Sequence, residues 1–186
     1  FTDRAIEVIS EHAAAEGPDG KPLFLYYAAQ AVHSPLSDPP AGSLLAADEA
    51  LISLLPDEDR RQFARMLRYQ DMSVGRVLSA LEKAGMMERT LVVVASDNGG
   101  CALYGSSNLP LRGLKHSLFE GGTRVPAFVY STSPALVPTA ARGTVYAELF
   151  HVTDWLPTLG AVAGFGTDIS FLDGVDQWAD LTGQRA

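Results

Sequence analysis

Two short apolar runs, at residues 23–29 and 90–96, constrain the fold more than any other feature of the chain. They read LFLYYAA and TLVVVAS, and their apolar residues are continuous rather than alternating with polar ones. This pattern is typical of strands covered on both faces, as in the parallel sheets that lie between helices. A third short strand is predicted at residues 125–130. The sequence therefore predicts a sheet with buried strands.

Helical patterns accompany these runs. Residues 59–84 carry apolar side chains at helical spacing, which predicts one long amphipathic helix. Shorter helices are predicted at residues 2–15, with Thr2 as a cap, and at residues 154–163, with Thr153 as a cap. Strands alternating with helices indicate an α/β protein, a sandwich of helices around a mostly parallel sheet.

The remaining segments are predicted to be irregular. Glycine and proline at residues 17–20 predict a turn. Residues 34–58 are rich in Pro, Ser, Ala and Asp and are expected to form a long surface loop, and the tail from Gly164 onward is expected to be irregular. The length of 186 residues suits one ordinary domain and is too short for two large ones.

Composition excludes several classes of protein. The net charge of −8 argues against a nucleic-acid partner, which normally selects a basic face. The single cysteine, Cys101, excludes a disulfide within the chain and a cysteine-rich zinc site. No run reaches the roughly 18 apolar residues that a membrane helix needs. The sequence gives no indication of oligomeric state.

The most informative motif is the tetrad Asp-Asn-Gly-Gly at residues 97–100, directly after a predicted strand. Sites of open α/β sheets gather at the carboxyl ends of strands. Asp97 and Asn98 offer two hard oxygen donors, which favour calcium or magnesium over zinc. Calcium takes about 6 to 8 oxygens, so further ligands must come from elsewhere. By itself, the tetrad is equally compatible with an ordinary turn.

Two further residues are candidates for binding an anion. Lys115 lies in a glycine-rich loop with Arg112 and Arg124 on either side, where a cation and backbone N–H groups can hold an oxyanion. His33 follows the first predicted strand and can donate to a substrate oxygen or protonate a leaving group. The alternatives are a solvated lysine and a structural histidine.

Other reactive side chains are interpreted as structural. Cys101 has neither a base nor an activating neighbour in the sequence, so it is expected to be a small packing residue. His151 and Asp154 are expected to provide a buried hydrogen bond and a first-turn charge at the start of a helix.

Taken together, these segments resemble the type I sulfatases of the alkaline phosphatase superfamily, and most closely the arylsulfatase B-like group. The resemblance covers nearly the whole chain, and the order and spacing of its fragments carry it. The fragments are residues 1–6 (FTDRAI), 22–26 (PLFLY), 30–36 (QAVHSPL), 96–100 (SDNGG), 110–115 (PLRGLK), 119–126 (FEGGTRVP), 151–158 (HVTDWLPT) and 172–174 (LDG).

The resemblance implies a calcium-dependent hydrolase of sulfate esters, with a small-molecule or saccharide sulfate ester as substrate. Asp97 and Asn98 match two calcium ligands of the family. His33 and Lys115 match residues that bind the sulfate and assist catalysis. The family is lysosomal or secreted, which is the location expected here by analogy.

The resemblance also implies missing parts. The family's nucleophile is a formylglycine made from a cysteine in a Cys-x-Pro-x-Arg motif, and this motif does not occur in the 186 residues. We therefore interpret residues 1–186 as the later part of a single sulfatase catalytic domain whose N-terminal part lies outside this chain, and we expect no activity from the chain alone. Two alternatives stay open: a phosphodiesterase or phosphonate hydrolase of the same superfamily, and a truncated non-catalytic pseudoenzyme.

Overall fold

The structure is a computed structural model that describes residues 1–17, 20–165 and 171–184. The chain divides into two compact units. Unit 1 contains Phe1–Met87 and Val93–Phe128, and unit 2 contains Glu88–Val92 and Val129–Ala186. None of the helices in the described part of the chain has the length and apolar character of a membrane span.

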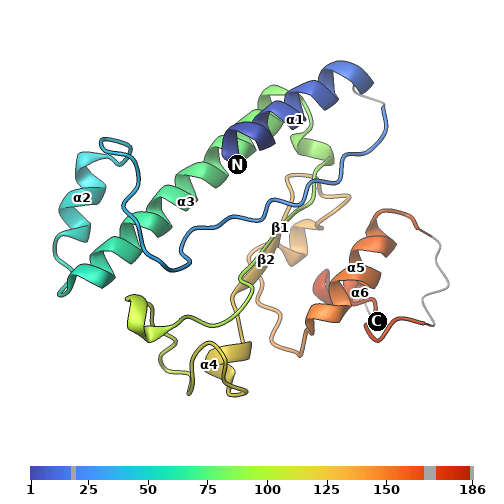
Figure 1. Cartoon of the computed structure of the whole chain (residues 1–186). Helices are drawn as coiled ribbons and strands as arrows, with labels where there is room; N and C mark the ends of the chain where they lie inside the picture. The colour runs from blue at the N-terminus through green and yellow to red at the C-terminus, as the bar shows by residue number, and fades with distance from the viewer. Residues whose placement is uncertain (18–19, 166–170, 185–186) are drawn as a thin grey trace. The chain divides into compact units, whose positions relative to one another are not determined.

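Two helices make the core of unit 1. Helix α1 (Thr2–Glu16) lies along helix α3 (Glu58–Lys83), as Figure 1 shows. Both predicted helices are thus confirmed to within a residue or two. The buried residues at the centre of their contact are apolar, which is the burial that holds two amphipathic helices together. They are Ile9, Ala80 and Leu81, surrounded by Ile6, Leu23, Val77, Leu78, Ala84, Met86 and Met87.

The helix starts differ in their chemistry. The Asp57 side chain caps α3 by accepting a hydrogen bond from the Arg60 N–H at 2.7 Å. The predicted Thr2 cap of α1 is wrong, because α1 begins after Phe1 without a side-chain cap. The Thr2 hydroxyl instead lies 2.8 Å from the Tyr27 hydroxyl. Two residues of the turn predicted at 17–20 lie outside the described residues.

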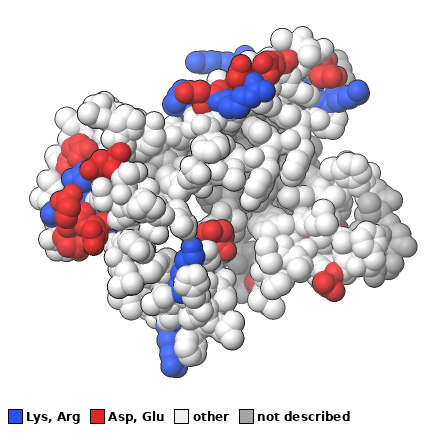
Figure 2. Space-filling model, viewed as in Figure 1, with Lys and Arg blue, Asp and Glu red and all other residues white. Residues whose placement is uncertain are grey.

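The predicted loop at residues 34–58 contains a short helix, α2 (Ala46–Ile52). Ion pairs connect this segment to α3. The Arg65 guanidinium contacts Asp38 at 3.1 Å, Glu49 at 3.4 Å and Glu58 at 2.9 Å. Hydrogen bonds from Arg65 and then from Arg61 lower the pKa of Glu58. Figure 2 shows acidic side chains gathered over this part of the surface with basic ones among them.

Residues 23–29 do not form the predicted strand. Their backbone has no strand assignment, although the sequence is apolar throughout. A strand needs a neighbour that accepts and donates backbone hydrogen bonds, and no strand of the described residues pairs with this segment. Phe24 is 83 % exposed and Tyr26 is 82 % exposed. Apart from Leu23, which packs against the α1–α3 core, and the half-buried Tyr27, the described residues leave the side chains of this apolar segment exposed.

The other two predicted strands are confirmed in part, as β1 (Val92–Ala95) and β2 (Ala127–Tyr130), which form a two-stranded sheet. The Ser96 N–H donates to the Pro126 carbonyl at 3.1 Å, beyond the end of β1 and before the start of β2. Such pairing of one strand's end with the other's beginning makes the strands antiparallel. The prediction of a mostly parallel sheet is therefore not met by the described residues.

Unit 2 contains helix α5 (Trp155–Val162) and helix α6 (Trp178–Leu181). The prediction at 154–163 is confirmed, but α6 contradicts an entirely irregular tail. Thr153 does not cap α5. The chain enters α5 through a 3-10 turn capped by His151, whose backbone N–H in turn donates to the Asp154 carboxylate.

The short elements of the two units complete the described structure. They are η1 (Met87–Arg89), η2 (Ala102–Tyr104), α4 (Glu120–Thr123), η3 (Thr139–Ala141) and η4 (Val152–Asp154).

Candidate functional site

Two glycine-rich segments of unit 1, residues 97–100 and 113–122, lie in direct backbone contact. The Gly99 N–H donates to the Gly122 carbonyl at 3.0 Å, and the second segment is closed on itself by the Gly121 N–H, which donates to the Arg112 carbonyl at 2.7 Å. A Cβ on Gly99 would overlap the carbonyl oxygen of Gly121. Only glycine allows two backbones to approach this closely, so the glycines bring the Asp97 turn against the Lys115 loop.

The structure brings His33 and Lys115 together, although 82 residues separate them in the sequence. Lys115 Nζ lies 3.1 Å from His33 Nε2. The backbone N–H of Lys115 donates to the Gly100 carbonyl at 3.2 Å, which connects the lysine to the end of the tetrad. Lys115 is half-buried and His33 is exposed. Both polar ends are thus presented at one place on unit 1.

The contacts of His33 define its tautomer. Its Nδ1 lies 2.6 Å from the Ser34 carbonyl oxygen, which can only accept, so Nδ1 carries a proton. Its Nε2 faces the Lys115 ammonium, which can only donate, so Nε2 accepts. This is the pattern of a neutral imidazole whose Nε2 is the nitrogen directed at the candidate site.

Asp97 and Asn98 present oxygens in the turn that leads to Gly100, the residue whose carbonyl accepts from the Lys115 N–H. Asp97 is exposed, and one of its carboxylate oxygens accepts the Asn98 N–H at 2.9 Å. The Asn98 Nδ2 donates to the Gly99 carbonyl at 2.9 Å, which turns its carboxamide oxygen away from that bond. The second Asp97 oxygen and Asn98 Oδ1 accept no hydrogen bond from the described residues, and both are hard donors of the kind that calcium takes.

These two oxygens are a partial ligand set. Within residues 1–17, 20–165 and 171–184 there is no group of three or more His, Cys, Asp or Glu side chains able to hold a metal ion. Two oxygens are fewer than the roughly 6 to 8 that calcium takes, so a calcium site that used them would need further ligands from elsewhere.

The other cations of the loop have different partners. Arg124 forms an ion pair with Glu120 at 3.1 Å. The Arg112 guanidinium lies over the Phe119 ring, 3.9 Å from its centroid. Lys115 makes no ion pair with a carboxylate among the described residues, so its charge is available to an anion that the chain itself does not supply.

Asn108 is a residue that the sequence reasoning missed. Its Oδ1 accepts the Gly100 N–H at 2.8 Å, and its Nδ2 donates to the carbonyls of Gly100 at 2.8 Å and Gly113 at 3.3 Å. The side chain thus joins the tetrad to the Lys115 loop. The available signal was an amide side chain inside a glycine-rich loop, a place where asparagine often bonds backbone groups.

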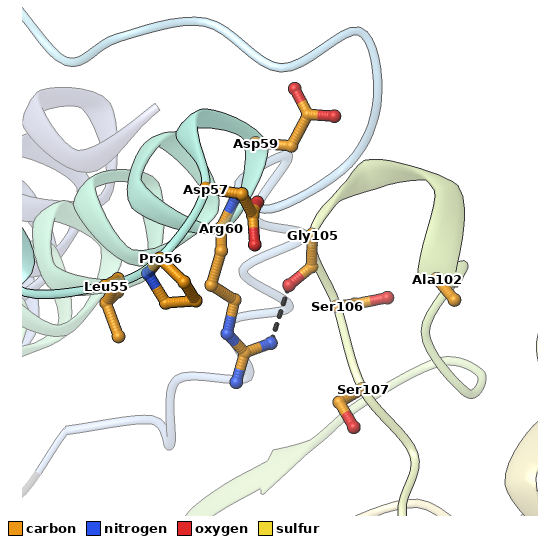
Figure 3. A pocket seen from close by; sticks show the side chains of 9 residues that line it. All are labelled: Leu55, Pro56, Asp57, Asp59, Arg60, Ala102, Gly105, Ser106 and Ser107. Carbon is orange, nitrogen blue, oxygen red and sulfur yellow. Dashed lines mark hydrogen bonds between the residues drawn. The ribbon is translucent and has the colours of Figure 1, made fainter.

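A cavity of about 420 Å³ lies in unit 1 between the start of α3 and residues 102–107 (Figure 3). Arg60 reaches across it and donates to the Gly105 carbonyl at 2.5 Å, as the dashed line in Figure 3 shows. Gly105 has a φ of 73°, and a Cβ there would press on the Asp59 carbonyl at 2.5 Å. The Arg60 guanidinium therefore braces the loop against the helix.

Asp154 is structural, as expected. It is 5 % exposed and accepts hydrogen bonds from the N–H groups of Val175 at 3.0 Å and His151 at 2.8 Å and from Gln177 Nε2 at 2.6 Å. Burial alone raises the pKa of Asp154, but these hydrogen bonds outweigh it and hold the pKa below the ordinary value of an aspartate. The expected buried bond belongs to Asp154, because the His151 side chain is exposed and lies 2.9 Å from the Thr153 hydroxyl.

Cys101 is half-buried and is the residue before η2. The described residues place no hydrogen-bonding base on its sulfur. Its environment agrees with the interpretation of a packing residue rather than a nucleophile.

Comparison with known proteins decides the family. The family model described as Sulfatase matches residues 1–165. The chain belongs to the sulfatase family. Mouse arylsulfatase J is 39% identical over 183 residues, covering 98% of this chain and 28% of that protein. Human arylsulfatase A is 34% identical over 160 residues, covering 84% of this chain and 28% of that protein.

A third sulfatase relative is the dog N-acetylgalactosamine-6-sulfatase, 30% identical over 181 residues, with 95% of this chain and 31% of that protein covered. The chain therefore spans about 30% of the length of these curated sulfatases. The homologues are hydrolases of sulfate esters, within the alkaline phosphatase superfamily.

Solved structures show the same fold. The structure of Ps i-CgsB in complex with k-i-k-neocarrahexaose superposes with a TM-score of 0.79 and 33% identity, covering 97% of this chain and 38% of that one. A second structure of Ps i-CgsB gives a TM-score of 0.83 and 30% identity, covering 99% and 38%. The sulfatase-like fold is thus confirmed for the part of the fold that this chain represents.

Proposed function

We propose that the protein containing this chain hydrolyses sulfate esters in the manner of an arylsulfatase, most like the arylsulfatase B group, with a sulfated sugar as the natural substrate. The observation that carries the proposal is the 3.1 Å contact between Lys115 Nζ and His33 Nε2. This contact brings together the family motifs that contain His33 and Lys115, which lie far apart in the sequence. The saccharide bound by a structural relative supports the substrate class.

Lys115 is proposed to bind the anionic sulfate oxygens. Its ammonium carries three donors, and one of them is directed at His33. A sulfate group beside it would provide oxygen acceptors of opposite charge, which bind an ammonium more strongly than a neutral imidazole does. As negative charge grows on those oxygens in the transition state, a fixed cation stabilises it.

His33 is proposed to act on the ester oxygen that leaves. The Ser34 carbonyl holds the Nδ1 proton, so the ring presents Nε2 to the site in a fixed orientation. Once a sulfate group binds the Lys115 ammonium, the Nε2 lone pair can take up a proton from water, and the resulting imidazolium can give that proton to the departing alcohol oxygen while Nδ1 keeps its own. The leaving group then departs as an alcohol rather than as an alkoxide.

Asp97 and Asn98 are proposed to contribute two calcium ligands, through the carboxylate and carboxamide oxygens that make no internal bond. Bound calcium would supply a second positive charge to the sulfate oxygens. The nucleophile is expected to be a formylglycine from a Cys-x-Pro-x-Arg motif beyond these 186 residues, and Cys101 has no part in the proposal.

The test is an assay of the complete gene product on matched esters of one phenol: a sulfate, a phosphate monoester and a phosphate diester, together with an aryl phosphonate. We expect the highest kcat/KM for the sulfate, and loss of turnover on calcium chelation that added calcium restores. Preference for the diester or the phosphonate would replace the proposal with a phosphodiesterase or phosphonate hydrolase. No turnover of any ester would favour a pseudoenzyme.

A further inference from the structure

Asn108 connects the two halves of the candidate site through its side chain. Its amide makes two bonds to one residue: Oδ1 accepts the Gly100 N–H at 2.8 Å, and Nδ2 donates to the Gly100 carbonyl at 2.8 Å. The second Nδ2 proton points to the Gly113 carbonyl at 3.3 Å. Exchanging the amide oxygen and nitrogen would place donors against the Gly100 N–H, so the contacts define one orientation.

Gly100 is close in the chain to the Asp97 and Asn98 oxygens and is also hydrogen-bonded to the backbone of Lys115. It lies two residues after Asn98, and its carbonyl accepts from Asn108 Nδ2 and also from the Lys115 N–H at 3.2 Å. Gly113, the other partner of Asn108, lies two residues before Lys115. The asparagine side chain therefore holds the peptide after the calcium ligands and the turn before the lysine at a set separation.

Direct backbone contacts do not replace this connection. The Gly99 N–H binds the Gly122 carbonyl, which ties the tetrad to a residue beyond the lysine rather than to the Gly113 turn. The Gly121 N–H binds the Arg112 carbonyl, a contact that does not include the tetrad. That turn closes on itself, because the Leu114 N–H donates to Ser117 Oγ at 3.1 Å and the Ser117 N–H donates to the Leu114 carbonyl at 2.9 Å. Without Asn108, the Lys115 N–H bond to Gly100 is the remaining described hydrogen bond between the tetrad and this turn.

We propose that Asn108 is a positioning residue that sets the separation between the Asp97–Asn98 oxygens and the Lys115 ammonium. The inference rests on the proposed function, in which both groups act on one sulfate. Since a displacement of about 1 Å in a catalytic group can cost on the order of 100-fold in rate, a side chain that never touches substrate can control turnover in this way.

The test is a double-mutant cycle in the complete gene product, with kcat and KM measured for a sulfate ester. Asn108→Ala is expected to lower kcat about 10- to 100-fold with KM little changed, because the misplaced groups act in the transition state. In a Lys115→Ala background the same change is expected to cost less than about threefold, since the group it positions is gone. Ser107→Ala, which removes only a 3.4 Å bond from the Leu109 N–H in the same loop, is the matched control and should change neither constant.

A merely structural role gives a different result. Asn108→Ala would then lower the melting temperature and would reduce kcat by the same factor in the Lys115→Ala background as in the wild type. That outcome overturns the proposal. Asn108→Asp is the second variant if alanine prevents folding. It keeps the shape and the acceptor for the Gly100 N–H but loses both donors, so it should show the same loss of kcat near neutral pH.

Hydrogen exchange at single amides gives a readout that is independent of activity. In Asn108→Ala the Lys115 amide should exchange faster, while the Gly99 and Gly121 amides, which have other acceptors, stay protected. If the wild-type protein turns over no sulfate ester, the proposed function fails, and this measurement alone decides the positioning role. An unchanged Lys115 amide would refute that role.

Discussion

The loop region of residues 97–122 in unit 1 and the region around Asp154 in unit 2 both contain charged groups held in place by hydrogen bonds. In the loop region backbone groups and Asn108 make most of those bonds, so the second Asp97 oxygen and the Lys115 ammonium remain available. Around Asp154 the carboxylate itself accepts three hydrogen bonds and is buried. A charge whose bonding capacity is used internally stabilises the fold, whereas one supported by backbone can act on a ligand.

The largest effect that tests this difference is expected at Lys115. Lys115→Ala in the complete gene product should lower kcat for a sulfate ester by about 100- to 1000-fold, the usual cost of removing one electrostatic stabiliser of a transition state. The melting temperature should stay within a degree or two, because the ammonium makes no ion pair in the described chain. Steady-state kinetics and calorimetry check both parts. Lys21→Ala, an exposed lysine, is the control.

A loss of stability without loss of kcat would place Lys115 with Asp154, as a structural charge. The comparison between the two regions would then fail at its central residue.

The glycine contact provides the next effect. Gly99→Ala should destabilise the protein by about 1–3 kcal/mol, because the new methyl group overlaps the Gly121 carbonyl and forces the two backbones apart. Gly75→Ala is the matched control. Gly75 lies in α3 with open space around its Cβ position, so alanine there should stabilise by about 0.5–1 kcal/mol. Denaturant titration of both variants measures the difference, and equal effects of either sign would disprove close backbone packing at Gly99.

Asp154→Asn tests the buried region. In the wild type both carboxylate oxygens accept from N–H groups, so the NH₂ group of the variant must face a donor. The lost hydrogen bond should lower the free energy of unfolding by about 1–3 kcal/mol. Because the pKa of Asp154 in the folded protein is lowered, its contribution to stability is present above the ordinary pKa of an aspartate and is lost as the pH falls through the lowered value. Stability measured against pH should therefore fall less steeply on acidification in the variant than in the wild type.

Asp173→Asn, at an exposed carboxylate, is the control for this experiment and should leave both stability and its acid dependence unchanged. A wild-type acid limb that Asp154→Asn does not flatten would show that the hydrogen bonds to Asp154 do not stabilise its charged form.

The smallest effect is expected on the exposed ion pairs of α2 and α3. Arg65→Gln removes contacts to three carboxylates, but such pairs are solvated, so the loss should be about 1 kcal/mol or less. The loss should shrink further in high salt, because exposed charges are screened. Thermal melts at low and high salt check this. A large loss that persists in salt would mean that Arg65 supports the fold as Asp154 does.

How far the sequence predicts this chain depends on where each residue finds its partners. Helices α1 and α3 were predictable because their apolar periodicity matches a face that they bury against each other. Residues 23–29 were not, because the same apolar pattern is compatible with any partner and the described residues contain none that pairs with them. The antiparallel pairing of β1 with β2 has no local signature, since it depends on how the intervening loop returns.

The candidate site shows the same limit. Motif resemblance selected His33, Lys115, Asp97 and Asn98, whose roles remain predictions, but it could not select Asn108. The function of that side chain arises from two carbonyls and an N–H that only the folded loop brings within reach. The tautomer of His33 likewise depends on the Ser34 carbonyl and on Lys115, and neither contact is visible in the sequence.

The most direct measurement of the central claim compares His33→Ala and Lys115→Ala on two sulfate esters, one with a nitrophenol leaving group and one with a sugar alcohol leaving group. If His33 protonates the departing oxygen, its loss should lower kcat/KM much more for the sugar sulfate, whose alcohol is a poor leaving group. Lys115→Ala should lower both equally, because it binds the sulfate oxygens common to them. Equal losses for His33→Ala on the two esters, or wild-type kcat/KM in either variant, would contradict a sulfate-ester site built on this pair.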